Sequence, residues 1–301
     1  MGIAADAVAL DGPLEGGFEG ATVTVEPLEA GSARFPRDFF EHEGRRIAAY
    51  RALLGRGDDD SYAEVPVSAF LVRHPTAGAM LVDTGLHPSV ASDPSHNMGG
   101  RAARYFSLER GRDVTSQLRE RGLGPGDIEV VVLTHLHVDH ASAISEFPES
   151  TFVLSAPEWE AATGARIPIL AGYHRAHFDH AVDYRVVDFD GDAIDSYGPF
   201  GRTFDLFGDG SVRIAFTPGH SAGHCSVLLR LPRRDFVVLG DVAYTWRQLQ
   251  GGPEPLRPVD RHNWRRSLHE VQAYINAYPY ALVVPSHDPE FFAKLDARYD
   301  E

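Results

Sequence analysis

The stretch Thr134-His135-Leu136-His137-Val138-Asp139-His140 places three histidines and one aspartate within six residues. It follows the run Glu129-Val130-Val131-Val132-Leu133, which has the length and β-branched content of a buried strand. Because side chains of an extended backbone repeat every second residue, His135 and His137 are expected to point the same way. Asp139 and His140 lie beyond a turn and can reach a second point nearby. The stretch therefore predicts a loop at a strand end that can hold two metal ions.

The composition indicates a folded chain with an acidic surface. Its 301 residues suffice for one large domain or two small ones, and 43% of them are hydrophobic, which supplies a core. The net charge of −15 repels phosphate backbones and so argues against a nucleic-acid substrate. Cys225 is the only cysteine, which excludes an internal disulfide.

The sequence carries no signal for secretion or membrane insertion. Residues 1–20 are acidic and glycine-rich and lack the basic start and apolar core of a signal peptide. No apolar run approaches the ~20 residues that span a bilayer. We therefore expect a cytoplasmic protein without a membrane partner. Residues 1–20 are expected to be a loosely ordered lead-in, and residues 21–301 to form a single domain.

Apolar runs of strand length recur along the chain, with turns and a few helical segments between them. Strands are expected at residues 21–25, 65–72, 79–82, 129–133, 151–154, 185–189, 204–207, 212–216, 226–231, 236–239 and 281–284. Helices are expected at residues 113–121, 157–163, 263–278 and 290–299. Residues 47–54 fit a strand or a short helix, and residues 157–182 are expected to be a helical insertion near the site.

Further polar residues stand just past the ends of expected strands: Asp83, His220, Asp241 and His287. Strands gather their ends at one edge of a fold, and sites form there. Imidazole nitrogens and carboxylates are ligands that suit zinc. The predicted assignment is His135, His137 and His220 for one ion, Asp139, His140 and His287 for a second, and Asp241 as a bridge. Two ions about 3.5–4 Å apart would share a hydroxide and hold the carbonyl that it attacks.

This ligand pattern resembles the motif of the metallo-β-lactamase superfamily, which corresponds here to residues 134–140, His220, Asp241 and His287. Every ligand position of the motif is filled. The resemblance implies an αβ/βα sandwich, a four-layer mixed α/β fold in which two mixed sheets are flanked by helices, with a dimetal site at one edge. It also implies that Asp83 supports a ligand histidine and does not bind metal itself.

The position of Tyr244, three residues after Asp241, points to one branch of this superfamily. Together with residues 133–140 and 217–224, it makes the chain similar to the N-acyl-homoserine lactone lactonases, the quorum-quenching branch of the superfamily. In that branch a tyrosine at this spacing points at the substrate carbonyl oxygen. The alternative for Tyr244 is a core aromatic residue with a satisfied hydroxyl.

The resemblance implies a hydrolase that opens a lactone ring by attack of a hydroxide bridging two divalent metal ions. Tyr244 would stabilise the oxyanion, and Asp139 would help deliver a proton to the leaving alkoxide. Zinc is the favoured metal, with manganese, iron and cobalt as alternatives. The partner is a small lactone, and a homodimer is left open.

Other hydrolases of the same scaffold are alternatives: a glutathione thioester hydrolase, a general lactonase or esterase, a β-lactamase or a phosphodiesterase. A glutathione thioester hydrolase would want a basic C-terminal patch, whereas residues 291–301 hold only Lys294 and Arg298 against three acids. The acidic net charge also disfavours a nuclease.

Several further residues have two interpretations. His174, His177 and His180 are polar partners more simply than metal ligands, and His224 and Cys225 are expected to be structural. Arg101 and Arg104 could face an anionic substrate. Other side chains could line an acyl pocket or pack in the core: Met98, Tyr105, Phe106, Ile169 and Tyr173.

Overall fold

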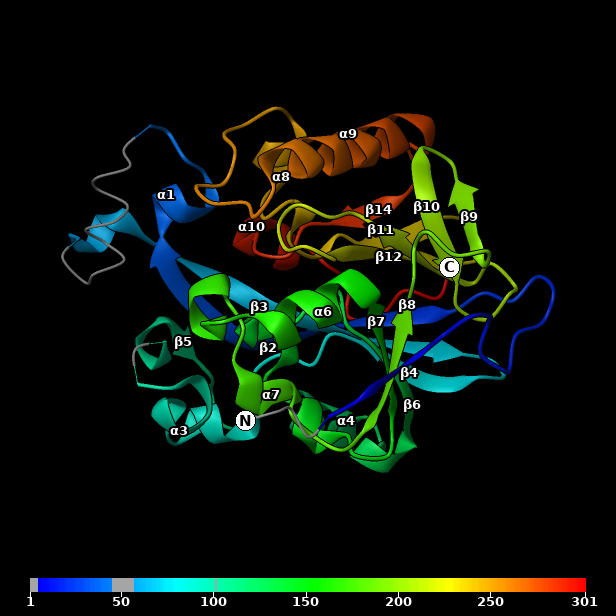
Figure 1. The fold of residues 1–301 in the computed structure, drawn as a ribbon, viewed down its shortest axis with the longest axis horizontal. Helices are drawn as coiled ribbons and strands as arrows, with labels where there is room; N and C mark the ends of the chain where they lie inside the picture. The colour runs from blue at the N-terminus through cyan, green and yellow to red at the C-terminus, as the bar shows by residue number, and fades with distance from the viewer. Residues whose placement is uncertain (1–4, 45–56, 101) are drawn as a thin grey trace.

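The structure is a computed structural model that describes residues 5–44, 57–100 and 102–301. The element expected at residues 47–54 and Arg101 lie outside these residues. Two sheets pack face to face, and helices cover their outer faces (Figure 1). Among the helices described, none is both long and apolar enough to cross a membrane.

The first sheet has eight strands, with parallel pairing on one side and antiparallel pairing on the other. Strands β4, β6, β7 and β8 run parallel, so the segments that follow β4 and β6 leave the sheet at the same edge. Across the sheet the strands are β1 (Ala7–Ala9), β8 (Asp183–Val187), β7 (Thr151–Ser155), β6 (Ile128–Val132), β4 (Gly78–Val82), β3 (Tyr62–His74), β2 (Thr24–Pro36) and β5 (Phe106–Ser107).

The second sheet has six strands and is antiparallel except at one edge, where β13 and β14 run parallel. The segments after these two parallel strands therefore also leave together. In order the strands are β14 (Leu282–Val284), β13 (Asp235–Val238), β12 (Cys225–Arg230), β11 (Val212–Phe216), β10 (Phe200–Asp205) and β9 (Ile194–Tyr197).

Short helices connect the strands, and one long helix covers the second sheet (Figure 1). The α-helices are α1 (Arg37–Phe40), α3 (Pro94–Met98), α4 (Val114–Glu120), α5 (Val138–Ala141), α6 (Ala156–Gly164), α7 (Arg175–Phe178), α8 (Trp246–Leu249), α9 (Arg261–Ala277) and α10 (Pro289–Phe292). The 3-10 turns are η1 (Asp59–Ser61), η2 (Pro88–Ala91), η3 (Ala103–Tyr105), η4 (Pro125–Asp127), η5 (Ile144–Glu146), η6 (Pro168–Ala171) and η7 (Gly240–Val242).

Strands of the first sheet alternate between two cores. Phe70 and Val72 of β3 face the second sheet, where the rings of Phe70 and Phe236 lie 5.7 Å apart. Ala69 and Leu71 point the other way, into the core that includes residues of α4. A strand that is buried on both faces reads as a continuous apolar run, which is why these strands were visible in the sequence.

Helix α9 covers the outer face of the second sheet. The carboxylate of Asp260 caps it by accepting from the backbone N–H groups of His262 and Asn263. Its buried side chains recur every three or four residues, which is the spacing of one helix face: Trp264, Ser267, Val271 and Tyr274.

Three expectations are corrected by the structure. The strand expected at residues 21–25 is β2, which continues to Pro36 through an irregularity between Glu29 and Ser32 that breaks its alternation. The helix expected at residues 290–299 ends at Phe292, and Tyr299 beyond it exchanges backbone hydrogen bonds with Val25.

The third correction concerns the lead-in, residues 1–20. Ala7–Ala9 form strand β1, which pairs with β8, and the Leu14 N–H donates to the Leu206 carbonyl. The free edge of β8 offers unpaired backbone groups, and the lead-in satisfies them. Residues 157–182, where a helical insertion is expected, contain most of α6 together with η6 and α7.

Candidate metal centre

The residues of the ligand motif meet at one edge of the sandwich, where the parallel strand ends of both sheets converge. They form two donor clusters, and within each cluster the ligand atoms all lie within 4.8 Å of one another. The first cluster consists of His135, His137, His220 and Asp241, and the second of Asp139, His140 and His287. This is the grouping that the sequence predicted.

Asp241 faces both clusters, one carboxylate oxygen to each. Its Oδ2 lies 3.2 Å from Nε2 of His220 in the first cluster. Its Oδ1 lies 3.3 Å from Nε2 of His140 and 3.3 Å from Nε2 of His287 in the second. This carboxylate can therefore bridge two ions.

In the first cluster, nitrogen lone pairs face one another at short range. Nε2 of His220 lies 2.8 Å from Nδ1 of His137 and 3.1 Å from Nε2 of His135. The other ring nitrogen of each is hydrogen-bonded outside the cluster: His135 Nδ1 to Thr134 Oγ1 at 3.1 Å, His137 Nε2 to the Ala171 carbonyl at 3.0 Å, and His220 Nδ1 to the Tyr244 hydroxyl at 3.0 Å. The inward nitrogens of the three rings are therefore all hydrogen-bond acceptors that face one another. A cation between them stabilises this arrangement.

The second cluster is built in the same way. Nδ1 of His140 donates to Asp83 at 2.7 Å, and Nδ1 of His287 donates to the Pro66 carbonyl at 2.9 Å. The inward atoms His140 Nε2 and Asp241 Oδ1 are buried without a hydrogen-bond partner in the structure. Buried polar atoms without a partner cost free energy, so this donor set fits a metal ion.

Asp83 supports the second cluster through its hydrogen bond with His140. It is the only residue other than glycine with a positive φ, 61°, among the described residues. Its carboxylate also accepts from the Thr134 N–H at 2.8 Å and from the Thr134 hydroxyl at 2.8 Å. The strained turn after β4 therefore presents both oxygens of Asp83 to the 134–140 loop.

Burial and nearby charges shift the pKa values of the histidines in opposite directions in the two clusters. Burial, together with the neighbouring imidazoles, lowers the pKa values of His135 and His220 well below the ordinary range, which keeps both rings neutral. Burial also acts to lower the pKa of His140, but the carboxylates of Asp83, Asp241 and Asp139 outweigh it and raise that pKa well above the usual value. The second cluster therefore has the stronger negative surroundings and attracts positive charge.

Glycines allow the ligand loops to approach the rest of the fold closely. Gly219 has a φ of 129°, and a Cβ there would collide with the backbone nitrogen of Trp264. This contact fixes the loop that carries His220 against the start of α9. Gly240 has a φ of 56°, and a Cβ there would lie 2.5 Å from Nε2 of His224.

His224 has the structural role that the sequence predicted. Its Nδ1 donates to the Thr217 carbonyl at 3.0 Å, and its Nε2 accepts from the Asp241 N–H at 2.8 Å. It therefore orients Asp241 through the backbone. Cys225 is fully buried in the core between the sheets, and burial raises the pKa of its thiol well above the usual value, so it is inert.

An apolar hollow of about 380 Å³ opens directly above the two clusters. Tyr244, His137, Asp139, His220 and Asp241 line its inner end. Aromatic and aliphatic side chains line its outer part: Phe35, Phe39, Phe40, Tyr105, Phe106, Ile169 and Leu170. A cavity of this size with a polar end and apolar walls suits a small substrate that has an apolar tail.

Sequence reasoning found only part of this lining. Tyr105, Phe106 and Ile169 line the hollow, whereas Met98 is fully buried in the neighbouring core and Tyr173 packs against His137. Phe35, Phe39, Phe40 and Leu170 were missed. The cluster of three phenylalanines within residues 35–40 was the available signal, because aromatic residues that close together rarely all fit one core face.

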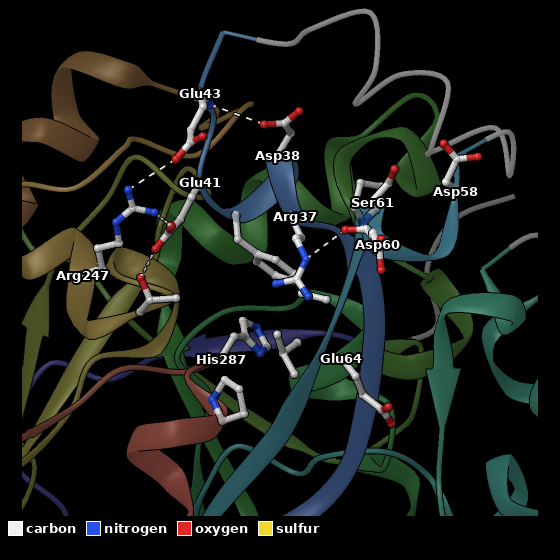
Figure 2. A pocket seen from close by; sticks show the side chains of 16 residues that line it. Arg37, Asp38, Glu41, Glu43, Asp58, Asp60, Ser61, Glu64, Arg247 and His287 are labelled. Carbon is white, nitrogen blue, oxygen red and sulfur yellow. Dashed lines mark hydrogen bonds and ion pairs between the residues drawn. The ribbon is translucent and has the colours of Figure 1, made fainter.

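A second, polar hollow of about 690 Å³ shares His287 and Phe40 with the first. Figure 2 shows the charged side chains that line it. Arg247 pairs there with Glu41 at 2.6 Å and with Glu43 at 3.3 Å. Arg37 donates to the Asp60 carbonyl at 3.1 Å. Because charged groups dominate this lining and many pair with one another, the hollow does not suit an apolar tail.

The remaining histidines of interest lie to one side of the clusters. His177 Nε2 donates to the Asn97 carbonyl at 2.9 Å, and the rings of His174 and His177 lie 4.7 Å apart. Within residues 5–44, 57–100 and 102–301, the groups of three or more donors able to hold an ion are the two clusters above.

Comparison with known proteins shows what the chain is similar to. N-acyl homoserine lactonase AttM of Agrobacterium fabrum is 33% identical to this chain over 253 residues, which cover 83% of this chain and 92% of that protein. N-acyl homoserine lactonase AttM of Azorhizobium caulinodans is 32% identical over 261 residues, which cover 85% of this chain and 95% of that protein.

A solved N-acyl homoserine lactone hydrolase with the product N-hexanoyl-L-homoserine at its metal centre matches the fold with a TM-score of 0.72. The match has 18% sequence identity and covers 91% of this chain and 97% of that one. At this identity the likeness concerns the fold, and it confirms the predicted αβ/βα sandwich. A sequence model of the metallo-beta-lactamase superfamily matches residues 62–287. The chain therefore belongs to the metallo-β-lactamase superfamily, as its ligand motif predicted.

Proposed function

We propose that this protein hydrolyses the ring ester of N-acyl-homoserine lactones with the help of two divalent metal ions. The observation that carries the proposal is the position of Asp241, whose two oxygens face one donor cluster each at the inner end of an apolar hollow. The names of the similar curated proteins support the choice of lactone.

The donor set determines how the ions would be held. His135, His137 and His220 would hold one ion, Asp139, His140 and His287 the other, and Asp241 would contact both. Nitrogen and carboxylate donors favour zinc, and they also accept manganese, iron or cobalt. Ions bound there supply a lowered pKa for water and polarisation of a carbonyl oxygen.

Tyr244 has a free proton to donate. Because Nε2 of His220 faces the cluster, its Nδ1–H donates to the Tyr244 oxygen at 3.0 Å. Burial raises the pKa of Tyr244 well above the usual value, and the carboxylates of Asp241 and Asp139 raise it further, so the hydroxyl keeps its own hydrogen. That hydrogen can point into the hollow and stabilise the oxyanion that forms on the lactone carbonyl.

Asp139 is the candidate that delivers a proton to the leaving alkoxide. It lines the hollow, and its Oδ2 lies 3.5 Å from Nε2 of His287. Its side chain is 14% exposed, so it is the more accessible of the carboxylates of the centre, since that of Asp241 is 5% exposed. A carboxylate in this position can take a proton during attack and return it as the ring C–O bond breaks.

The apolar walls would take the acyl chain of the substrate. Phe35 and Tyr105 stack with ring centroids 4.7 Å apart, and Phe40 packs edge-on against Tyr244 at 5.2 Å. The aromatic wall therefore reaches from the mouth of the hollow to the proposed oxyanion donor. An acyl chain along this wall would place its amide and lactone at the polar end.

The test is ring opening, followed by proton release, with metal content measured on the same preparation. The substrates are homoserine lactones of increasing acyl length, a simple lactone without an amide, a glutathione thioester and a β-lactam. We expect the acylated lactones to be opened fastest and the preparation to contain two ions per chain. Asp241→Asn is the matched inactive control, because it keeps the side-chain shape and removes the shared charge.

Two of the alternatives, a general lactonase or esterase and a glutathione thioester hydrolase, each have a distinct outcome in this panel. Equal rates on lactones with and without an amide would favour a general lactonase or esterase. Activity confined to the glutathione thioester would overturn the substrate while leaving the scaffold intact. Absence of stoichiometric transition metal would overturn the mechanism.

The proposal places the reaction in the cytoplasm, on a small molecule, without a nucleic-acid or membrane partner. Cell fractionation tests the location. Light scattering of the purified protein decides between a monomer and a homodimer.

A further inference from the structure

Glu158 is a buried carboxylate directly behind the first donor cluster. It lies near the start of α6 and is fully buried, with 0% of its surface exposed. The donors that reach it are neutral backbone N–H groups and hydroxyls. A buried carboxylate among neutral groups is costly, so its presence calls for a specific use of its two oxygens.

The two oxygens divide between the two loops that supply the histidines. Oε1 accepts from the N–H of Leu136, which stands between His135 and His137, at 3.0 Å. Oε2 accepts from the Ser221 hydroxyl at 2.6 Å and from the Gly223 N–H at 3.0 Å, both in the loop that carries His220. One rigid group therefore sets the separation of the two loops.

The start of α6 around Glu158 packs closely against the loop that carries His220. The Ser155 hydroxyl caps α6 by accepting from the Glu158 N–H at 3.1 Å and itself donates to the Gly223 carbonyl at 2.5 Å. A Cβ on Gly223 would collide with the backbone nitrogen of Glu158. The loop therefore sits directly on the helix start, with no room for a bridging water.

Glu158 also contacts the segment that covers the hollow. The Tyr173 hydroxyl donates to it, and the Tyr173 ring lies 5.2 Å from the ring of His137. In the same segment the Ala171 carbonyl accepts from His137 Nε2 at 3.0 Å. The His137 ring is thus contacted by Ala171 and by Tyr173, and Tyr173 is itself hydrogen-bonded to Glu158.

We propose that Glu158 is a positioning residue that sets the geometry of the metal site formed by His135, His137 and His220. The inference rests on the proposed function only in assuming that this cluster binds an ion. In the second cluster His140 is held by Asp83, whereas the Glu158 carboxylate bonds the backbone between His135 and His137 and the loop that carries His220. Loss of Glu158 should therefore affect one ion and spare the other.

Glu158→Gln is the informative variant, because an amide has nearly the same shape but only one acceptor oxygen. It can serve Leu136 or the Ser221 and Gly223 donors, but not both. We expect the affinity for one ion to fall about 10–100-fold, the range known for groups that support metal ligands. The affinity for the other ion should change by less than about threefold.

The measurements are stepwise metal affinities by chelator competition, the d–d absorption of the cobalt-loaded protein, and kcat and KM separately. We expect a changed cobalt spectrum and a lower kcat with KM nearly constant, because the altered geometry acts on the reacting centre. The affected ion is assigned in a His287→Ala background, where the second cluster lacks one ligand.

Glu26→Gln is the matched control. Glu26 is also a buried carboxylate, but it lies on β2 and pairs with Arg73 and Arg121. Its loss should lower the unfolding temperature without changing metal affinity or the cobalt spectrum. If Glu158→Gln fails to fold, Ser221→Ala removes a single donor and should weaken the same ion to a smaller extent.

Two results would overturn the inference. One is that Glu158→Gln behaves like Glu26→Gln, with lower stability but both metal affinities and the spectrum unchanged. The other is a wild-type protein that binds fewer than two ions. A wild-type protein that binds two ions but opens no lactone would overturn the proposed function alone, and the metal affinities would still decide the role of Glu158.

Discussion

The floor and the rim of the apolar hollow are held in different ways. We call the seven residues of the two donor clusters the floor, and residues 35–40, 102–106 and 167–172 the rim. In the floor every histidine is hydrogen-bonded through its outward nitrogen, to Thr134, Ala171, Asp83, Pro66 or Tyr244. In the rim, Ile169 is 49% exposed and Leu170 is 74% exposed. The floor fixes geometry, and the rim offers apolar surface.

This difference has an energetic basis. A floor residue that loses its partner leaves a buried polar atom unpaired, which costs about 1–3 kcal/mol and displaces a ligand atom. A rim side chain contributes only contact area, at about 25 cal/mol per Å² of apolar surface covered by substrate. We therefore expect floor substitutions to act on the chemistry and rim substitutions to act on substrate preference.

The strongest test of the floor is His137→Ala. This change removes one of three histidines from the first cluster, and we expect turnover to fall by more than about 10³-fold together with loss of one ion. His269→Ala is the control, because His269 is exposed on α9. Substantial turnover in His137→Ala with full metal content would break the distinction between floor and rim.

Tyr244→Phe tests whether an oxyanion donor stands beside the floor. We expect kcat to fall about 10²–10³-fold with KM nearly unchanged, the size known for loss of one such donor. Metal content must be measured as well, because the same hydroxyl accepts from His220 Nδ1. Turnover like that of the wild type would remove the tyrosine from the mechanism.

Removal of metal should loosen the floor and leave most of the fold intact. An ion whose free concentration is about 100–1,000 times its dissociation constant adds about 3–4 kcal/mol to the free energy of unfolding. This corresponds to about 5–10 °C in the unfolding temperature of a chain this long. Calorimetry with and without a chelator measures the shift. Asp241→Ala should show a much smaller shift, and an equal shift in that variant would assign the effect to the chelator.

The sequence predicted the floor well because its chemistry admits few residue types. A histidine or aspartate just past an apolar run, as at His220, Asp241 and His287, rarely serves packing alone when several such positions occur together. Asp83 was also foreseen, since its strand ends at the same edge. Tyr244 was expected to face the substrate, and the structure adds its contact with His220, which no spacing rule contains.

The rim residues and the role of Glu158 were harder to predict from the sequence. Phe35 lies on β2 beyond the irregularity between Glu29 and Ser32, and Phe39 lies in a helix of four residues, so neither continues the alternation of the strand expected at residues 21–25. Glu158 stands near a helix start, where a glutamate is ordinarily read as a capping residue. Its importance arises from Leu136 and Ser221, which are distant in sequence and become neighbours only through the fold.

Acid should weaken the contact between α7 and α3 that His177 makes with the Asn97 carbonyl. Burial lowers the pKa of His177 to about 3, opposed by its bond to the Asn97 carbonyl and reinforced by His174, His87 and His180. The unfolded chain takes up a proton below its ordinary pKa of about 6.5, whereas the native state stays neutral down to about 3. Stability from this group is therefore complete above pH ~6.5 and is lost as the pH falls toward 3.

The His177→Asn variant isolates this contribution. Relative to the wild type, its unfolding free energy should decline less between pH 6.5 and 5, by about 1–2 kcal/mol. Parallel curves for the two proteins would show that other buried histidines, such as His224, carry the acid sensitivity. Denaturant unfolding at several pH values measures both curves.

Leu170→Ala should give the smallest effect and the clearest evidence on the rim. The side chain is largely exposed in the structure, so its loss should change stability by less than about 0.5 kcal/mol. If a long acyl chain lies against it, each methylene covered contributes up to about 0.8 kcal/mol, and kcat/KM for that substrate should fall roughly three- to tenfold. A short acyl chain does not reach Leu170 and should be opened at the wild-type rate.

Val8→Ala is the matched control for that comparison, because Val8 is 54% exposed on β1 at the far edge of the first sheet. It removes a similar apolar surface without touching the hollow, so its rates on all chain lengths should equal those of the wild type. The ratio of long-chain to short-chain kcat/KM then reports rim contact alone, since any change in the floor would scale both substrates together. An unchanged ratio in Leu170→Ala would mean that the acyl chain leaves the hollow by another side, and Phe35 and Tyr105 would be the next residues to substitute.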